Sequence, residues 1–337
     1  MTLRVVCDDE SRIGEARRAA DGIARSCGLD EHVRGTLAIV VTEAATNLAR
    51  HAKRGVILLR ETSALGPTGV ELLAVDCGPG MHDLDRHFAD GFSTGGTSGA
   101  GLGAMRRQAD QLDVYSVPGQ GTVVLARVFA AGPESPAPRL LDIGIVCLAL
   151  DGEAVCGDGW CVRQDADRAT VLVVDGLGHG PNAAQAADTA LDVFRVTDDR
   201  TPKETVSIIH DALRATRGAA VAVAEVRRTS DGASVELCGV GNTVTAVIGA
   251  AGPRSLPSMN GTAGLSIRAL QSFTQTLRSD DLLVMHTDGL TTRWRLDAYP
   301  RVREHDPAIA AALLHRDASR GRDDATVLAL RLRAPAA

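Results

Sequence analysis

The chain has 337 residues, a length that predicts two domains, each large enough to bury its own core. Its net charge of −6 argues against nucleic acid as the main partner, and an aromatic content of 3% leaves few rings for stacking on bases. No apolar run reaches the roughly 18 residues of a membrane span, and no signal-peptide pattern is present, so we expect a cytoplasmic protein. The seven cysteines form no CxxC pair and are expected to be reduced thiols.

A proline-rich stretch divides the chain. Residues 131–139 contain three prolines within six positions, which excludes a helix interior or a central strand. We therefore expect a first domain over residues 1–130, a linker over residues 131–139 and a second domain over residues 140–335.

Hydrophobic periodicity in the first domain predicts three helices and four strands. The strongest helix has one apolar stripe, formed by Val33, Leu37, Val40, Ala44 and Leu48. The expected helices cover residues 11–27, 31–52 and 102–112, and the expected strands cover residues 56–61, 70–76, 113–116 and 122–129.

The second domain has a different order of elements. Its apolar runs predict strands over residues 141–150, 170–175, 219–227, 233–238, 243–248, 281–287 and 325–332. Helices fit residues 181–196, 202–216 and 306–317. Consecutive strands with grouped helices favour a layered α+β sandwich over a doubly wound sheet, and we predict an α+β fold for the chain.

Two polar residues on the second expected helix are candidates for nucleotide chemistry. Glu43 and Asn47 are four residues apart, so they share a helix face, beside the apolar stripe. A carboxylate there can orient or deprotonate a hydroxyl, and an amide oxygen can bind Mg²⁺. Two solvated residues on a helix edge would explain this pair equally well if it stood alone.

Two glycine-containing segments follow the Glu43/Asn47 pair. Asp76-Cys-Gly-Pro-Gly80 comes directly after a strand, where the carboxylate can accept a hydrogen bond from an exocyclic amine, although an ordinary turn would use the same residues. Residues 95–103 read Gly-Gly-Thr-Ser-Gly-Ala-Gly-Leu-Gly and open a helix, whose free N–H groups and dipole favour phosphate. The three elements in this order predict a nucleotide site.

This order of motifs resembles the Bergerat (GHKL) ATPase fold shared by gyrase, Hsp90, histidine kinases and the MutL proteins. The segment from Asp90, with Gly119-Gln-Gly-Thr122 after it, is similar to the small serine/threonine kinases that act as anti-sigma factors or stressosome switch kinases. The resemblance covers roughly residues 5–130 and implies an α/β sandwich that binds ATP and Mg²⁺. It implies that Glu43 is the catalytic base and Asn47 the Mg²⁺ ligand. The resemblance also implies that Asp76 holds the adenine. The further nucleotide-binding residues it implies, around the ring and the phosphates, are Gly78, Gly80, Gly99, Gly101, Gly103 and Thr122.

Aspartates stand at the ends of several expected strands of the second domain. Asp175 and Asp288 each end an apolar run and precede glycine, and Asp323 and Asp324 precede the last strand. Buried strand ends are costly places for unpaired carboxylates unless the carboxylates converge on divalent cations. Two such ions can activate a bridging water and hold phosphoryl oxygens for in-line attack. A turn would explain any one of these aspartates, but their shared context, with Asp158 upstream, favours a metal site.

The set resembles the metal-dependent PPM (PP2C) protein phosphatases, in particular the bacterial, SpoIIE-like branch of sporulation and stress-response enzymes, over about residues 140–333. The resemblance implies an αββα sandwich with two Mn²⁺ or Mg²⁺ ions, and with Asp324 orienting rather than ligating. The ligands it implies are Asp158, Asp175, the carbonyl of Gly176, Asp288 and Asp323.

Two positions depart from that family's patterns. Cys161 stands where the branch often has a second aspartate, which leaves an accessory metal contact open. His179 follows Asp175 at a longer offset than the histidine of the eukaryotic Asp-Gly-His-Gly form. It is a candidate general acid, but we favour packing within the turn.

Together the resemblances predict a bifunctional partner-switching regulator. The first domain would phosphorylate a serine or threonine of a STAS-domain protein in a sigma-factor or stress pathway, and the second would hydrolyse phosphoserine or phosphothreonine. The alternative is a first domain that binds ATP without transferring phosphate and serves as a sensor, or as an anti-sigma-type docking module, that gates the phosphatase. We expect neither a nucleic-acid nor a membrane partner.

Overall fold

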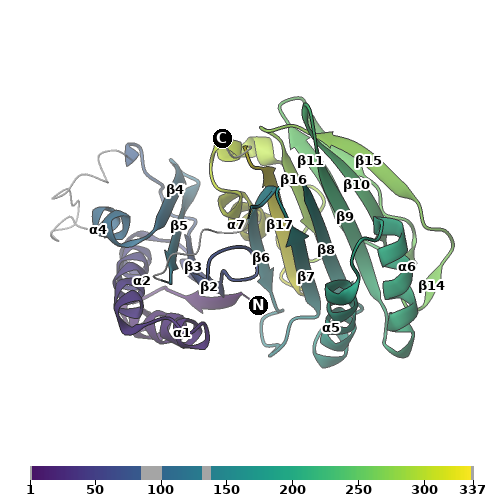
Figure 1. Ribbon diagram of the computed structural model, residues 1–337. Helices are drawn as coiled ribbons and strands as arrows, with labels where there is room; N and C mark the ends of the chain where they lie inside the picture. The colour runs from purple at the N-terminus through teal and green to yellow at the C-terminus, as the bar shows by residue number, and fades with distance from the viewer. Residues whose placement is uncertain (1, 85–100, 131–137, 335–337) are drawn as a thin grey trace. The chain divides into compact units, whose positions relative to one another are not determined.

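The computed structural model describes residues 2–84, 101–130 and 138–334 (Figure 1). The chain forms two compact units, Met1–Pro136 and Ala137–Ala337. Most of the expected linker, residues 131–137, lies outside the described residues. Among the described residues, no helix is long and apolar enough to cross a membrane.

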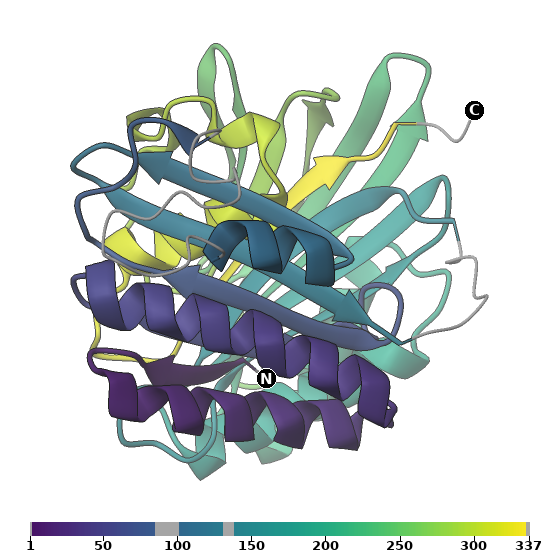
Figure 2. The same ribbon diagram turned by 90° about the vertical axis from the view of Figure 1, so that its left-hand side faces the viewer.

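The first unit is a five-stranded antiparallel sheet with its helices on one face (Figure 2). The strand order is β1-β2-β3-β5-β4. The strands are β1 Leu3–Val6, β2 Val56–Glu61, β3 Gly69–Val75, β4 Gln111–Val117 and β5 Gly121–Phe129. The helices are η1 Glu10–Arg12 (a 3₁₀ turn), α1 Ile13–Ser26, α2 Glu31–His51 and α4 Gly101–Gln108.

Helix α2 forms where the sequence predicts it. The Asp30 carboxylate accepts the N–H of Val33 at 2.9 Å, which satisfies a donor that the first turn leaves open. The predicted apolar stripe is confirmed, since all five of its members are buried. The stripe packs with Ile57, Leu59 and Leu72 of the sheet in one core, so α2 is fixed in rotation and its polar edge has a defined direction.

Three charged residues form a ladder on the other face of this sheet. Arg60, Glu71 and Arg127 are cross-strand neighbours on β2, β3 and β5. Nε of Arg60 lies 2.6 Å from Oε1 of Glu71, and Nε of Arg127 lies 2.7 Å from Oε2. Burial alone would raise the pKa of Glu71, but the charges of both arginines outweigh it and lower that pKa. This carboxylate therefore stabilises the unit above the ordinary glutamate pKa, and the stabilisation is lost as the pH falls through the lower, folded-state value.

Glu71→Gln should destabilise the first unit by roughly 3–5 kcal/mol at neutral pH, because it leaves the buried guanidinium group of Arg60 and the half-buried one of Arg127 without their counterion. The loss should shrink as the pH falls through the lowered, folded-state pKa of the wild-type carboxyl. Urea unfolding at neutral pH and at successively lower pH values measures it. Asp21→Asn, in partly exposed pairs with Arg25 and Arg34, is the control and should cost much less than Glu71→Gln. Equal losses for the two variants would contradict the ladder's role.

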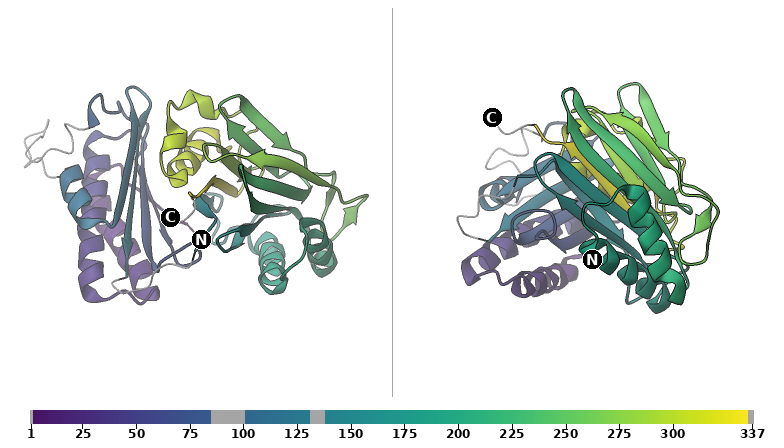
Figure 3. Two further views of the ribbon diagram at one scale, coloured as in Figure 1. Left: turned by 45° about the horizontal axis from the view of Figure 1, so that its top comes forward. Right: turned by 45° about the vertical axis from the view of Figure 1, so that its right-hand side comes forward.

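The second unit is a sandwich of two five-stranded antiparallel sheets with helices on both outer faces (Figure 3). One sheet has the order β15-β10-β9-β8-β7 and packs against α5 and α6, and the other has the order β12-β11-β16-β17-β6 and packs against α7. The strands are β6 Leu141–Leu148, β7 Asp158–Gln164, β8 Arg168–Gly176, β9 Ala219–Thr229, β10 Gly232–Val240, β11 Val244–Gly249, β12 Gly252–Leu256, β15 Ser272–Leu277, β16 Leu282–His286 and β17 Ala325–Leu332, with a hairpin of β13 Gly261–Thr262 and β14 Ser266–Ile267. The helices are α5 Pro181–Val196, α6 Pro202–Ala212 and α7 Pro307–Ala318, with 3₁₀ turns η2 Leu213–Ala215, η3 Leu296–Ala298 and η4 Val302–Glu304.

The predicted α+β class is confirmed, and the differences from the sequence prediction concern element ends and edge strands. The helix expected to reach residue 112 ends at Gln108, because Gln111 and Leu112 pair with β5. The helix expected over residues 202–216 ends at Ala212 and continues as a 3₁₀ turn. The sequence prediction missed β1, β7, β12, β15 and the β13–β14 hairpin, which are short, polar or at sheet edges, where side chains show little hydrophobic alternation.

Candidate functional sites

The first candidate site begins on the polar edge of α2. Glu43 and Asn47 are half-buried there, beside the core stripe. The start of α4 meets them directly, since a Cβ built on Gly101 would lie 3.3 Å from Oδ1 of Asn47 and 3.6 Å from Oε2 of Glu43. A carboxylate, an amide and a helix N-terminus therefore converge at one point.

The end of α2 meets the second motif. A Cβ on Gly78 would lie 3.0 Å from the carbonyl oxygen of His51, one helical turn beyond Asn47. The N–H of Gly78 donates to Oδ1 of Asp76, directly after β3. The loop that starts at Asp76 thus lies against the same helix that carries Glu43.

The β4–β5 hairpin holds this loop from the other side. Gly80 and Gly121 both have positive φ, and a Cβ on either would come within 2.2 Å of a carbonyl oxygen, of Val117 and Asp76 respectively. Only glycine fits such contacts. The Thr122 carbonyl accepts the N–H of Asp76 at 3.0 Å, so this predicted nucleotide contact also positions the aspartate's backbone.

Sequence reasoning missed Ser116 in this group. Its hydroxyl lies 2.9 Å from Oγ1 of Thr122 and accepts the N–H of Met81 at 2.8 Å. Ser116 is the direct cross-strand partner of Thr122, so the register of the hairpin around Gly119 was the signal that could have found it.

The predicted phosphate loop is only partly described. Gly103 lies buried within α4. Gly99 and the rest of the segment over residues 85–100 lie outside the described residues.

The second candidate site lies where strands of both sheets of the sandwich end. Asp158 and Asp175 are direct cross-strand partners on β7 and β8 of one sheet. Asp288 follows β16, and Asp323 precedes β17, in the other sheet. The sandwich therefore brings together carboxylates that are up to 165 positions apart, from 158 to 323.

One threonine joins the two sheets at this point. Oγ1 of Thr287 donates to Oδ2 of Asp158 at 2.7 Å and accepts the N–H of Thr326 at 3.0 Å. The N–H of Thr287 in turn donates to the carbonyl of Thr326 at 3.0 Å. Thr287 thus fixes Asp158 relative to Asp288, which is the next residue after the threonine. Sequence reasoning did not single it out.

Asp324 holds a loop through its side chain. Its two oxygens accept the N–H groups of Leu150 at 2.7 Å and Gly157 at 2.6 Å. These residues stand near the two ends of the connection between β6 and β7. Both hydrogen bonds hold backbone groups, and the orienting role expected for Asp324 stays a prediction.

The carboxylates raise one another's proton affinity. Burial, and then the charges of Asp288 and Asp323, raise the pKa of Asp175 to about 7. Burial and the charge of Asp175 raise the pKa of Asp158 well above its ordinary value, and burial and the charge of Asp288 raise that of Asp323. The ionised cluster is therefore costly unless positive charge offsets it.

The donor set fits divalent cations that keep part of their water. Oδ2 of Asp175 is buried and has no hydrogen-bond partner among the described residues, so it is open to a ligand bond. No group of three or more His, Cys, Asp or Glu side chains in the described part of the chain lies close enough together to hold a metal ion by itself. Mg²⁺ is commonly bound through one or two carboxylates with several waters, which suits this open arrangement.

Three further residues bear on the expected metal site: Asn242, which contacts one of the aspartates, and Cys161 and His179, where the sequence departs from the family patterns. Nδ2 of Asn242 donates to Oδ2 of Asp288 and orients it. Cys161 packs in the core beneath α5, so a carboxylate in that position would point away from Asp158, three residues earlier on the same strand. His179 is half-exposed in its turn, with Nδ1 2.6 Å from Oε1 of Glu153.

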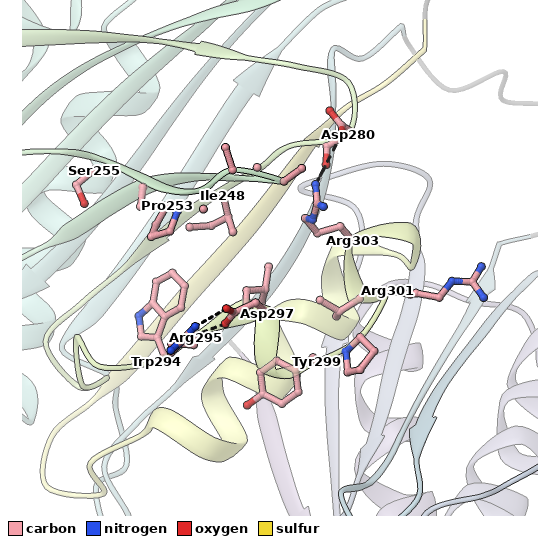
Figure 4. Close-up of a pocket in the computed structure, with 18 of the residues that line it drawn as sticks. Ile248, Pro253, Ser255, Asp280, Trp294, Arg295, Asp297, Tyr299, Arg301 and Arg303 are labelled. Atoms are coloured by element: carbon pink, nitrogen blue, oxygen red, sulfur yellow. Dashed lines mark hydrogen bonds and ion pairs between the residues drawn. The ribbon is translucent and has the colours of Figure 1, made fainter.

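A separate pocket of about 850 Å³ lies over β11, β12 and residues 292–304 (Figure 4). Its arginines are paired with carboxylates, in the pairs Arg295–Asp297, Arg301–Glu304 and Arg303–Asp280. None of the site aspartates lines it. Trp294 in its wall donates its indole N–H to Nε2 of His286 at 2.9 Å, which is a structural link and not a reactive group.

Comparison with known families assigns the two halves of the chain to two different domains. Residues 7–128 match the histidine kinase-like ATPase domain, and residues 165–333, half of the chain, match the Stage II sporulation protein E (SpoIIE) family. The chain is thus a kinase-like ATPase domain followed by a PP2C-type phosphatase domain. It belongs to the SpoIIE family.

Two curated relatives each resemble one half of the chain. The serine/threonine-protein kinase RsbT of Bacillus subtilis is 32% identical over 111 residues, 33% of this chain and 84% of that protein. The phosphoserine phosphatase RsbX of the same organism is 22% identical over 159 residues, 47% of this chain and 75% of that protein. A structure solved in work on the bacterial stressosome covers 57% of this chain and 99% of its own at 27% identity (TM-score 0.52). RsbX with magnesium covers 60% and 98% at 19% identity (TM-score 0.51), a likeness of fold.

Asp175→Asn should raise the unfolding temperature of the metal-free phosphatase unit near pH 8, because it removes one of the crowded charges. A relief of about 1 kcal/mol corresponds to roughly 2–4 °C in a unit of this size. The variant should also lose the rise that Mn²⁺ gives the wild type. Thermal unfolding with EDTA and with Mn²⁺ measures both, and Asp231→Asn, in the exposed β9–β10 turn, is the control. A metal-free variant less stable than the wild type, with an intact Mn²⁺ response, would refute the charge crowding.

Proposed function

We propose that this protein is a bifunctional partner-switching regulator. Its first domain transfers the γ-phosphate of ATP to a serine or threonine of a STAS-domain protein, and its second domain hydrolyses phosphoserine or phosphothreonine. The observation that carries the phosphatase half is the meeting of Asp158, Asp175 and Asp288 from two sheets, with one buried carboxylate oxygen open. The kinase half is supported by Glu43 and Asn47 of α2, which lie against the start of α4, and by the likeness to RsbT.

In the first domain, each group has a separate task. The Glu43 carboxylate accepts the proton of the attacking hydroxyl, whose oxygen bonds to the γ-phosphorus while ADP leaves. Asn47 would hold Mg²⁺ through its amide oxygen, which adds no negative charge beside the phosphates. Asp76 is held by hydrogen bonds with the Gly78 N–H and the Thr122 carbonyl, and its carboxylate accepts a hydrogen bond from the exocyclic amine of adenine.

In the second domain, Asp158, Asp175, Asp288, Asp323 and the Gly176 carbonyl would hold two Mn²⁺ or Mg²⁺ ions. Such ions supply a water of lowered pKa and neutralise phosphoryl oxygens. Thr287 and Asn242 orient two of the carboxylates, and Asp324 keeps the Gly157 backbone in place. The chain's own contribution is therefore a rigid, desolvated set of oxygens.

Glu43→Ala should lower phosphate transfer to a purified STAS-domain protein by roughly 10²–10⁴-fold and leave ATP binding in place, because it removes the base and not the nucleotide contacts. Radiolabelled ATP measures transfer, and fluorescence titration with a labelled nucleotide measures binding. Glu31→Ala, exposed on the same helix, is the control. Transfer that survives Glu43→Ala would sink the kinase assignment.

Phosphatase rates that respond to ATP without any phosphate transfer to the STAS-domain protein would support the gating alternative instead.

Asp288→Asn should lower Mn²⁺-dependent hydrolysis of p-nitrophenyl phosphate by roughly 100-fold or more, because it removes a ligand. Thr287→Val removes the hydrogen bond to Asp158 and the one from the Thr326 N–H, but no ligand, and turnover should fall in the range of about 10–100-fold that is typical of groups orienting a ligand. The Mn²⁺ dependence of turnover separates the two, with Asp231→Asn as the control. Full turnover in Asp288→Asn would exclude the metal site as drawn.

A further inference from the structure

Two cysteines of the second unit face each other beside the carboxylate site. Sγ of Cys147, on β6, lies 3.9 Å from Sγ of Cys156, in the connection between β6 and β7. Both are thiols and not a disulfide. Cys147 is buried and Cys156 is half-buried, so Cys156 is the more exposed residue of the pair.

The distance between the sulfurs is short enough for a bond. A disulfide has an S–S length of about 2.05 Å, so the sulfurs would need to approach by roughly 1.9 Å. The backbone amides of Leu150 and Gly157 are tied to the same Asp324 carboxylate, which already holds the two ends of this connection together.

A shift of Cys156 cannot stay local. The next residue, Gly157, donates its N–H to Asp324 at 2.6 Å, and its carbonyl accepts the N–H of Gly176 at 3.0 Å. A Cβ on Gly157 would lie 2.6 Å from Cβ of Ala183, so this backbone has no free space on that side. The residue after it is Asp158. A displacement of Cys156 therefore also displaces Asp158, Asp324 and the Gly176 backbone.

We propose that Cys147 and Cys156 form an oxidation-sensitive site that weakens the metal centre when they are joined. Hydrogen peroxide transfers one oxygen to the sulfur of Cys156, with loss of water, to give a sulfenic acid. The sulfur of Cys147 then attacks that sulfur, and the hydroxyl leaves as a second water. In sum, two thiols are oxidised to one disulfide and one peroxide is reduced to two waters. A thiol reductant reverses the reaction.

The test uses the full-length chain treated with graded hydrogen peroxide. Peptide mapping without reductant should show one species that links residues 147 and 156, lighter by two hydrogen atoms than the separate peptides. Titration calorimetry should show Mn²⁺ binding weakened by about tenfold or more, the range known for perturbed outer contacts of metal sites, and recovery after reduction. Turnover on p-nitrophenyl phosphate should fall in parallel. That last readout rests on the proposed phosphatase activity, whereas linkage and Mn²⁺ binding do not.

Three variants make the test specific. Cys156→Ser and Cys147→Ser should keep their Mn²⁺ affinity after peroxide, and Cys147→Ala covers the case in which a buried serine disturbs folding. Cys161→Ser, half-buried on β7 and packed beneath α5, is the matched control and should remain as sensitive as the wild type. Absence of the 147–156 link, or a linked protein with wild-type Mn²⁺ affinity, would overturn the inference. A reduced wild type without turnover would count against the proposed function alone.

Discussion

The gathering of negative charge at the ends of strands from two sheets is the constraint on which the second unit depends. Asp158 and Asp175 come from one sheet, and Asp288 and Asp323 from the other, so the cluster exists only while the sheets are packed face to face. Burial and mutual repulsion raise the proton affinity of three of them. The surrounding hydrogen bonds from Thr287 and Asn242 keep these groups close in spite of that repulsion. This repulsion lowers the stability of the second unit, and cation binding at the same site can restore it.

The first unit positions its site residues in a different way from the second unit. Its site needs a carboxylate and an amide at fixed spacing and a loop that leaves room for a planar ring. The core stripe of α2 sets the direction of Glu43 and Asn47, and contacts that admit no side chain hold Gly80 and Gly121. Here the precision comes from backbone packing rather than from balanced charge.

The sequence was sufficient for the α+β class and for the long helices, because their hydrophobic periodicity is strong. It also singled out Asp175 and Asp288, because each follows an apolar run and precedes glycine, whereas Asp158 was added by its upstream position and by the family resemblance. It could not show that Thr287 joins the sheets or that Ser116 pairs with Thr122, because both depend on strand register. The direction of Cys161 was equally hidden, since it follows from the alternation along β7, a strand that the sequence prediction missed.

The two compact units share one polypeptide, and this has a consequence for control. Separate kinases and phosphatases can be made in different amounts, so a cell can shift their balance by synthesis. A single chain always supplies its two units in equal number. If the units catalyse opposite reactions on one protein, simultaneous activity would only consume ATP. The direction of the switch must then be decided by ligands and covalent state, namely nucleotide on one unit and divalent cation on the other, and not by copy number.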